Sequence, residues 1–242
     1  MARAHKKFLF VLTSHTKLGD TGEKTGFHFS EMSLPYFMLE DNGVDVTLAS
    51  IKGGEAPADP KSLKQAEEDG EESVARFLED SEAHEKLKNT FDLEHISADE
   101  YEGIYMPGGH GAMWDFPENK DLKNLIETFW AQGKIVASVC HGPAALVSVM
   151  DEDGFPIVRN KLVNCFTNEE EKAIGKDKAM PFALETKLRE LGALFQHADN
   201  FEGFAIEDGR LITGQNPESA EKVARAIIRC LGLTVQDKEE AA

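Results

Sequence analysis

The sequence predicts an α/β fold built on an open parallel sheet that is sandwiched by helices. Short apolar runs alternate along the chain with amphipathic stretches, which is the pattern of successive strand–helix units. A length of 242 residues suits one large domain of this class. No internal repeat or low-complexity linker divides the sequence, so residues 1–242 are expected to form a single domain.

The N-terminal part of the chain predicts a first strand–helix–strand unit. Residues 8–13 form an apolar run that is typical of a buried strand. Helical spacing extends from about residue 26 to residue 41, and Asn42-Gly43 supplies a C-terminal stop. Residues 44–49 alternate between apolar and polar side chains, as expected for a second strand.

A polar insertion then interrupts the alternation. Residues 55–99 are rich in Asp, Glu and Lys, with helical patterning around residues 73–87. Three interpretations remain open for this segment: a solvated excursion, a lid, or an arm used in dimer formation.

Regular alternation resumes after the insertion. Strands are predicted at residues 103–106, 134–139 and 210–213, and helices at residues 119–132, 142–150 and 217–231. Asn216 as N-cap and Pro217 at the first helical position mark the start of the last helix. Residues 236–242 are expected to form an acidic tail.

The composition excludes several classes of function. The chain has 26 basic and 44 acidic residues, and its net charge of −18 would repel nucleic acids and anionic membranes. No apolar stretch approaches the length of a membrane span, and the run at residues 8–12 is too short for a signal sequence. The three cysteines show neither a disulfide framework nor metal-ligand spacing. A reduced, cytoplasmic protein without a bound metal is therefore expected.

The most informative segment is the junction between a predicted strand and a predicted helix at Cys140. Ser138 and Gly142 flank this cysteine at minus two and plus two, and a nucleophile elbow needs such small residues. The N-terminus of the following helix and its backbone N–H groups would favour a thiolate. His141 can orient beside the thiol, and its N–H is a candidate oxyanion donor. Cys140 is therefore predicted to be a nucleophile rather than a small core residue.

A glycine cluster follows the preceding predicted strand. In Pro107-Gly108-Gly109-His110-Gly111 the glycines allow a ligand to approach the backbone and present N–H donors. Parallel strands end along one sheet edge, where the ligands of open α/β folds bind. Gly108 and Gly109 are therefore expected to contribute to oxyanion and substrate binding near Cys140. The side chains expected to line the pocket are His110, Trp114 and Phe116.

Taken together, these motifs resemble the PfpI superfamily, a branch of the class I glutamine amidotransferase-like fold. Within it the chain is most similar to the heat-shock chaperone branch with glyoxalase III activity. The resemblance covers nearly the whole chain and rests on Lys24-Thr25-Gly26 with Glu31, Gly108–Gly111, Asp115-Phe116-Pro117, residues 137–143 and residues 208–217. It implies a flavodoxin-like sheet and a homodimer.

The family resemblance also implies roles for particular residues. It implies a triad of Cys140, His141 and an acid within Glu169–Glu171, of which Glu171 matches best. It places Glu31 beside the thiol, where burial and the like charge would raise the pKa of that carboxyl. Either Glu31 or His141 would then act as the base.

The activity that the resemblance implies is a cofactor-free conversion of methylglyoxal, or a similar small 2-oxoaldehyde, to lactate without glutathione. The Cys140 thiolate would form a hemithioacetal with the aldehyde, as in a lyase of the D-lactate dehydratase type. The alternatives are a holdase chaperone or thiol stress-response protein, a deglycase and a cysteine peptidase, whose partners would include unfolded or glycated proteins. A glutamine amidotransferase is disfavoured, because the only histidine after His141 is His197, and it is followed by Ala198-Asp199 rather than completing a His-x-Glu pair.

Overall fold

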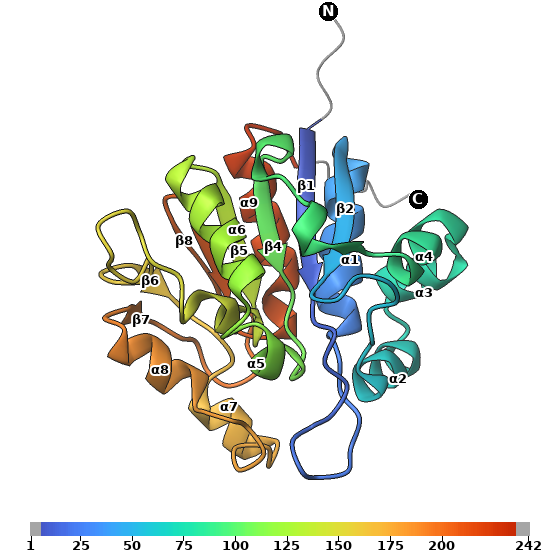
Figure 1. The fold of residues 1–242 in the computed structure, drawn as a ribbon. Helices are drawn as coiled ribbons and strands as arrows, with labels where there is room; N and C mark the ends of the chain where they lie inside the picture. Colours follow the sequence, from blue (N-terminus) through green and yellow to red (C-terminus); the bar gives the residue numbers. More distant parts are fainter. Residues whose placement is uncertain (1–5, 236–242) are drawn as a thin grey trace, which may run out of the picture.

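A computed structural model describes residues 6–235 (Figure 1), and the acidic tail expected at residues 236–242 lies outside this range. Within the described chain, a seven-stranded sheet has the order β3-β2-β1-β4-β5-β9-β8. Its strands are β1 (Lys6–Leu12), β2 (Val44–Ser50), β3 (Phe91–Asp92), β4 (Gly103–Met106), β5 (Ile135–Val139), β8 (Ala205–Asp208) and β9 (Leu211–Gly214).

Neighbouring strands of this sheet are parallel, apart from the pair β8 and β9. The predicted α/β fold with an open parallel sheet is thus confirmed. The antiparallel edge strand β8 was not predicted, and such an edge is common on sheets of this kind.

Helices cover both faces of the sheet (Figure 1). One face carries α1 (Phe29–Asp41) and α9 (Ala220–Cys230), and the other carries α5 (Ala112–Asp115) and α6 (Lys120–Ala131). Phe8 and Phe10 of β1 belong to the first core, whereas Leu9 and Val11 belong to the second, because side chains alternate along a strand. Burial on both faces explains why β1 is a continuous apolar run.

The insertion at residues 55–99 contains three short helices, two of which cover the helical patterning expected around residues 73–87. They are α2 (Pro60–Asp69), α3 (Glu72–Glu79) and α4 (Ser81–Lys88). Asp59 and Asp80 cap α2 and α4 with their carboxylates, and Gly70 ends α2 in the left-handed conformation. Phe77 of α3 is fully buried and contacts the aromatic rings of α1. The insertion is therefore packed onto the domain and is not a purely solvated excursion.

A short 3₁₀ helix replaces one predicted helical segment and forms the first turn of another. The helix expected at residues 142–150 is the five-residue 3₁₀ helix η3 (Gly142–Leu146). The helix expected from residue 217 starts as η4 (Pro217–Ser219) and continues as α9. Two further 3₁₀ helices precede β4, namely η1 (Leu93–His95) and η2 (Ala98–Glu100).

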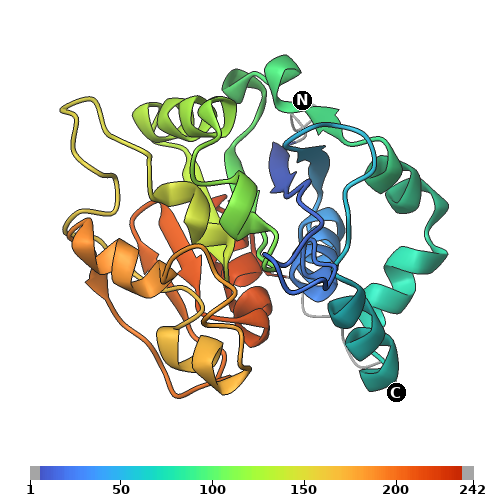
Figure 2. The ribbon, with the colours of Figure 1, turned by 60° about the horizontal axis from the view of Figure 1, so that its bottom comes forward.

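Residues 151–204 form a smaller layer that the sequence pattern did not reveal. It contains a parallel strand pair, β6 (Leu162–Val163) and β7 (Leu194–Phe195), and the helices α7 (Asn168–Ala173) and α8 (Leu184–Glu190). Figure 2 shows this yellow-to-orange layer beside the end of the main sheet. In the described part of the chain, no helix combines the length and the apolar character needed to span a membrane.

Candidate active site

The candidate site lies at the carboxyl ends of the central strands, which Figure 2 turns toward the reader. From β1 the chain continues to β2 on one side of the sheet, and from β4 it continues to β5 on the opposite side. The point between β1 and β4 is therefore a topological switch point. Ligands of open α/β folds bind at such a switch point. The segments that follow β1, β4 and β5 supply Glu31, Gly108–His110 and Cys140, respectively.

Cys140 occupies the sharp turn that its flanking residues predict. Its φ of 58° is in the left-handed region, which non-glycine residues seldom adopt. The turn is held because Cys140 N–H donates to the carbonyl of Gly214 at 2.9 Å, and Phe166 N–H donates to the carbonyl of Cys140 at 2.9 Å. A Cβ at Gly142 would lie 2.1 Å from the Met106 carbonyl oxygen, so glycine is required there. The elbow is thus a strained backbone fixed by its neighbours.

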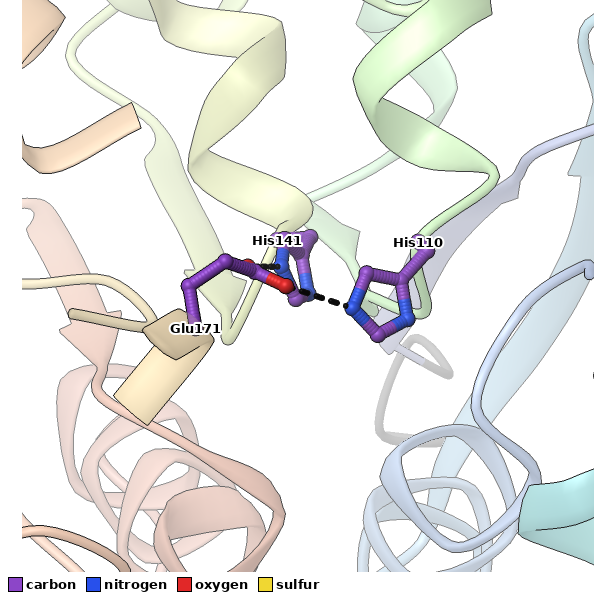
Figure 3. A group of neighbouring side chains, drawn as sticks. All are labelled: His110, His141 and Glu171. Carbon is purple, nitrogen blue, oxygen red and sulfur yellow. Dashed lines mark hydrogen bonds and ion pairs between the residues drawn. The ribbon is translucent and has the colours of Figure 1, made fainter. Parts of the chain in front are cut away.

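A chain of side chains connects Cys140 to an acid on α7. The Sγ atom lies 3.2 Å from His141 Nδ1, and His141 Nε2 lies 2.7 Å from Glu171 Oε2. The other carboxylate oxygen, Oε1, lies 3.0 Å from His110 Nε2. Figure 3 shows dashed lines that join the carboxylate of Glu171 to both imidazoles. Glu171 therefore orients His141 and is itself held by His110.

The other two glutamates of the α7 segment lie elsewhere. Glu169 is exposed. Glu170 is fully buried, but its carboxylate accepts hydrogen bonds from the backbone N–H groups of Thr167 and Phe201 and from the side-chain amides of Gln215 and Asn216. Glu170 thus joins α7 to the later loops, and only Glu171 reaches His141.

The electrostatic environment favours an ionised Glu171 and a neutral His141. Although burial works against ionisation, the contacts with His141 and His110 hold the pKa of Glu171 well below its usual range. Burial, together with the nearby His110, lowers the pKa of His141 despite the contact with Glu171. A neutral His141 that donates Nε2–H to Glu171 presents Nδ1 as an acceptor toward the thiol.

Glu31 is a fully buried carboxyl beside the thiol. Its Oε2 accepts the N–H of Gly108 at 2.7 Å, and its side chain interacts with that of Cys140. Burial raises the pKa of Glu31 to about 8, although these two contacts oppose the change. The N–H of Gly108 is therefore used to hold Glu31 and is not available to a substrate. This corrects the expectation of an oxyanion donor at Gly108.

The environment of Cys140 differs from the expected one. Burial and the Glu31 carboxyl raise the pKa of the thiol well above its usual value, although the N–H of Gly109 donates to the sulfur. The expected helix dipole is weak because η3 is only five residues long and 3₁₀. A freely ionised thiolate is therefore not favoured. Ionisation of Cys140 depends on whether Glu31 is neutral and whether His141 accepts the thiol proton.

A cavity of about 460 Å³ gives access to Cys140. Lys61 and Lys176 both bind Glu23 in its wall, at 2.6 and 2.7 Å, so the insertion contributes to the site. Of the three expected pocket residues, only His110 lines this cavity. Phe116 is buried in the core behind it, and Trp114 stacks on His15. Core packing, which the sequence does not reveal, decides this difference.

Two imidazoles and a carboxylate form a donor set for a divalent cation. One nitrogen or oxygen atom from each of His110, His141 and Glu171 lies within 4.8 Å of the others. Histidine nitrogens and carboxylate oxygens are common ligands of Zn²⁺ in proteins. A cation bound there would occupy the same atoms that connect Glu171 to His141, so it would compete with the hydrogen bond between them.

The fold and the site together define an α/β protein with a cysteine at a nucleophile elbow, backed by a histidine–glutamate pair and a buried glutamate. The model of the DJ-1/PfpI family matches residues 24–230, and the chain belongs to this family. Glutathione-independent glyoxalase HSP31 of Saccharomyces cerevisiae is 32% identical over 228 residues, which are 91% of this chain and 96% of that protein.

Two solved structures are similar over most of the chain. Rapid Encystment Protein 24 KDa of Francisella tularensis is 38% identical with a TM-score of 0.89, and the match covers 93% of this chain and 99% of that one. Glyoxalase III of Candida albicans is 27% identical with a TM-score of 0.81, covering 93% and 97%. These likenesses agree with the predicted family branch.

Sequence reasoning did not identify two residues of the site. His28 lines the cavity, and its only sequence signal was its place three residues before Glu31 at the start of a helix. The sequence indicates Glu170 only as an alternative acid for the triad, whereas its hydrogen bonds anchor α7 in the structure. Both roles depend on contacts with distant segments.

Proposed function

We propose that this protein is a glutathione-independent glyoxalase that converts methylglyoxal or a similar 2-oxoaldehyde to lactate, with Cys140 as nucleophile. The observation that carries the proposal is the position of the Cys140 thiol between two proton carriers, His141 Nδ1 at 3.2 Å and the buried Glu31 carboxyl. Relatives that span nearly the whole chain and are named glyoxalases support it.

The first step is addition of the thiol to the aldehyde carbon, C1. His141 Nδ1 accepts the thiol proton as the carbon–sulfur bond forms, and Glu171 stabilises the resulting imidazolium. The N–H of His141 is one proposed donor to the developing oxyanion. The N–H of Gly109, which donates to the sulfur in the free site, is the second, and it would turn from the sulfur to the oxyanion as the carbon–sulfur bond forms. Glu31, largely protonated at neutral pH, transfers its proton to this oxygen and is left ionised. The product is a hemithioacetal.

The second step moves a proton from C1 to C2. Ionised Glu31 takes the C1 proton, the electron pair moves toward the C2 oxygen, and His141 protonates that oxygen to give an enediol. Glu31 then protonates C2 while the C1 hydroxyl proton passes to His141, which gives a thioester of lactate. Water adds to the thioester and gives its proton to Glu31, and the departing sulfur takes the proton of His141. The sum is methylglyoxal plus water to lactate.

A lactate assay without glutathione tests this function. We expect wild type to form lactate from methylglyoxal, and Cys140→Ala to form none above the uncatalysed rate. Cys230→Ala is the matched control, because Cys230 is a partly exposed thiol on α9. Equal lactate formation by wild type and Cys140→Ala would refute the proposal.

The size of the cavity favours a second candidate function, removal of 2-oxoaldehyde adducts from proteins. A volume of about 460 Å³ lies in the range of about 300–1,000 Å³ typical of sites for drug-sized ligands, and a three-carbon aldehyde fills only part of it. A glycated side chain would enter the same cavity and meet the same thiol. Release of lactate from a methylglyoxal-treated peptide, measured after free aldehyde has been removed, distinguishes this activity.

A further inference from the structure

Two buried polar atoms beside Cys140 face each other without hydrogen bonds. Among residues 6–235, both His28 Nδ1 and Glu31 Oε1 lack a partner. The two atoms lie 4.0 Å apart, with His28 immediately before α1 and Glu31 in its first turn. Buried polar atoms are costly when they are unsatisfied, so such a pair calls for an explanation. A small rotation of the ring would bring the atoms into hydrogen-bond contact, and catalytic contacts often tighten in this way when substrate binds.

His28 also forms part of the cavity wall. Its side chain is 25% exposed, and it lines the same cavity as Cys140 and Gly109. The two nitrogens of an imidazole point in divergent directions. Because Nδ1 is buried on the side of Glu31 while the side chain is partly exposed in the cavity, we infer that the ring edge that carries Nε2 is on the cavity side. The N–H of His28 donates to the carbonyl of Gly108 at 3.1 Å, which fixes the residue against the glycine turn.

The surroundings select one tautomer of His28. Burial, assisted by His110 and His141, lowers the pKa of His28 to about 4, although Asp59 opposes this change, so the imidazole is neutral. A neutral imidazole has one N–H and one acceptor nitrogen. The protonated Glu31 carboxyl is a donor, so Nδ1 is its natural acceptor and the hydrogen of His28 is placed on Nε2. The cavity therefore receives an N–H donor from this side.

We propose that His28 is a further substrate-binding residue, which recognises the keto oxygen on C2 of a 2-oxoaldehyde through Nε2–H. The inference rests on the proposed glyoxalase function and names its specificity determinant. The oxygen on C1 is assigned to backbone N–H donors, and the oxygen on C2 receives its proton from His141 during the second step. A donor that stays in place, Nε2–H of His28, would hold the oxygen on C2 before and during that proton transfer. The Glu31 side chain interacts with that of Cys140 and its Oε1 lies 4.0 Å from His28 Nδ1, so one carboxyl neighbours both the proposed nucleophile and the proposed donor.

Three substitutions at position 28 separate this role from a structural one. His28→Gln keeps an N–H donor at the position of Nε2, His28→Asn moves it to the position of Nδ1, and His28→Phe keeps a ring without nitrogen. His84→Phe on α4 is the control for loss of an imidazole. Each variant is titrated with methylglyoxal and with propanal, a three-carbon aldehyde that has no keto oxygen. The readout is the aldehyde concentration that protects Cys140 from alkylation by iodoacetamide.

We expect the preference for methylglyoxal over propanal, relative to wild type, to fall about tenfold in His28→Phe and His28→Asn, because one hydrogen bond is lost. His28→Gln and His84→Phe should keep the preference. The inference is wrong if His28→Phe weakens protection by the two aldehydes to the same extent. It is also wrong if His28→Gln and His28→Asn show the same preference for methylglyoxal over propanal. Should the Phe variant fail to fold, the comparison of Gln with Asn is the test.

Protection by reversible addition does not require turnover, so this experiment is separable from the lactate assay. A wild type that is protected selectively by methylglyoxal but forms no lactate would refute the proposed function and leave the role of His28 intact. A wild type that forms lactate while His28→Phe keeps full selectivity would refute only the role of His28. Absence of protection by either aldehyde in wild type would refute both.

Discussion

Replacing Glu31 by glutamine should remove a pH dependence of stability that arises from its burial. Burial raises the pKa of this carboxyl from 4.5 to about 8. Below the lower value both the folded and the unfolded chain hold the proton, and folding carries no penalty. Between the two values the folded chain keeps a proton that the unfolded chain releases, so the free energy of unfolding falls as pH rises. Above the higher value the loss is complete.

The size of this effect follows from the two pKa values. Within the window the wild type loses about 1.4 kcal/mol per pH unit, and about 5 kcal/mol in total as an upper limit. Glutamine is neutral at every pH, and its side-chain oxygen can still accept the hydrogen bond from the N–H of Gly108. The variant should therefore gain stability relative to wild type as pH rises, although it lacks a carboxyl that we propose to be catalytic.

Urea unfolding at about pH 5.5, 6.5 and 7.5 measures the effect, because all three conditions lie inside the window. The difference between the free energies of unfolding, variant minus wild type, should rise by about 1.4 kcal/mol per pH unit. Glu79→Gln, which replaces an exposed carboxylate at the end of α3, should show no such trend. A constant difference for Glu31→Gln across the three conditions would refute the raised pKa and, with it, the role of Glu31 as a neutral acid.

Three further predictions concern the turn, the triad and the imidazole pair. Gly109→Ala should lower the free energy of unfolding by at least about 2 kcal/mol, because its φ is +90° and a Cβ would lie 2.3 Å from a carbonyl oxygen. Gly133→Ala (φ +65°), whose Cβ would meet open space, should cost only about 1–2 kcal/mol, and equal losses in thermal unfolding would contradict this reasoning. Glu171→Gln should lower kcat about 100-fold or more while Glu169→Gln leaves it unchanged, and lactate formation measures both; equal effects would mean that the acid is wrongly assigned. Zn²⁺ should inhibit reversibly, and His110→Ala should need about tenfold more Zn²⁺, because one of three ligands is lost; unaltered sensitivity would place the inhibiting cation elsewhere.

The parts of the fold that were predicted correctly are those with strong local signals. The strand at residues 103–106 matches β4, and the helix at residues 119–132 contains α6 with Asn119 as its cap. The strand is marked by a short apolar run that ends in Pro107-Gly108, and the helix by the period of its apolar residues and its end signals, all of which are local properties. The layer at residues 151–204 was missed, because its strands are only two residues long and carry no readable period.

The sequence by itself determined the position of the sharp turn at Cys140, because such an elbow needs small residues at fixed distances on either side of the cysteine. Only the tertiary structure decided which acid reaches His141, since three consecutive glutamates differ in the direction in which α7 presents them. It also decided the charge of Glu31 and the exposure of His28, which depend on how completely distant segments exclude water from each group. Spacing along a chain fixes local geometry, whereas burial and proton affinity are properties of the assembled site.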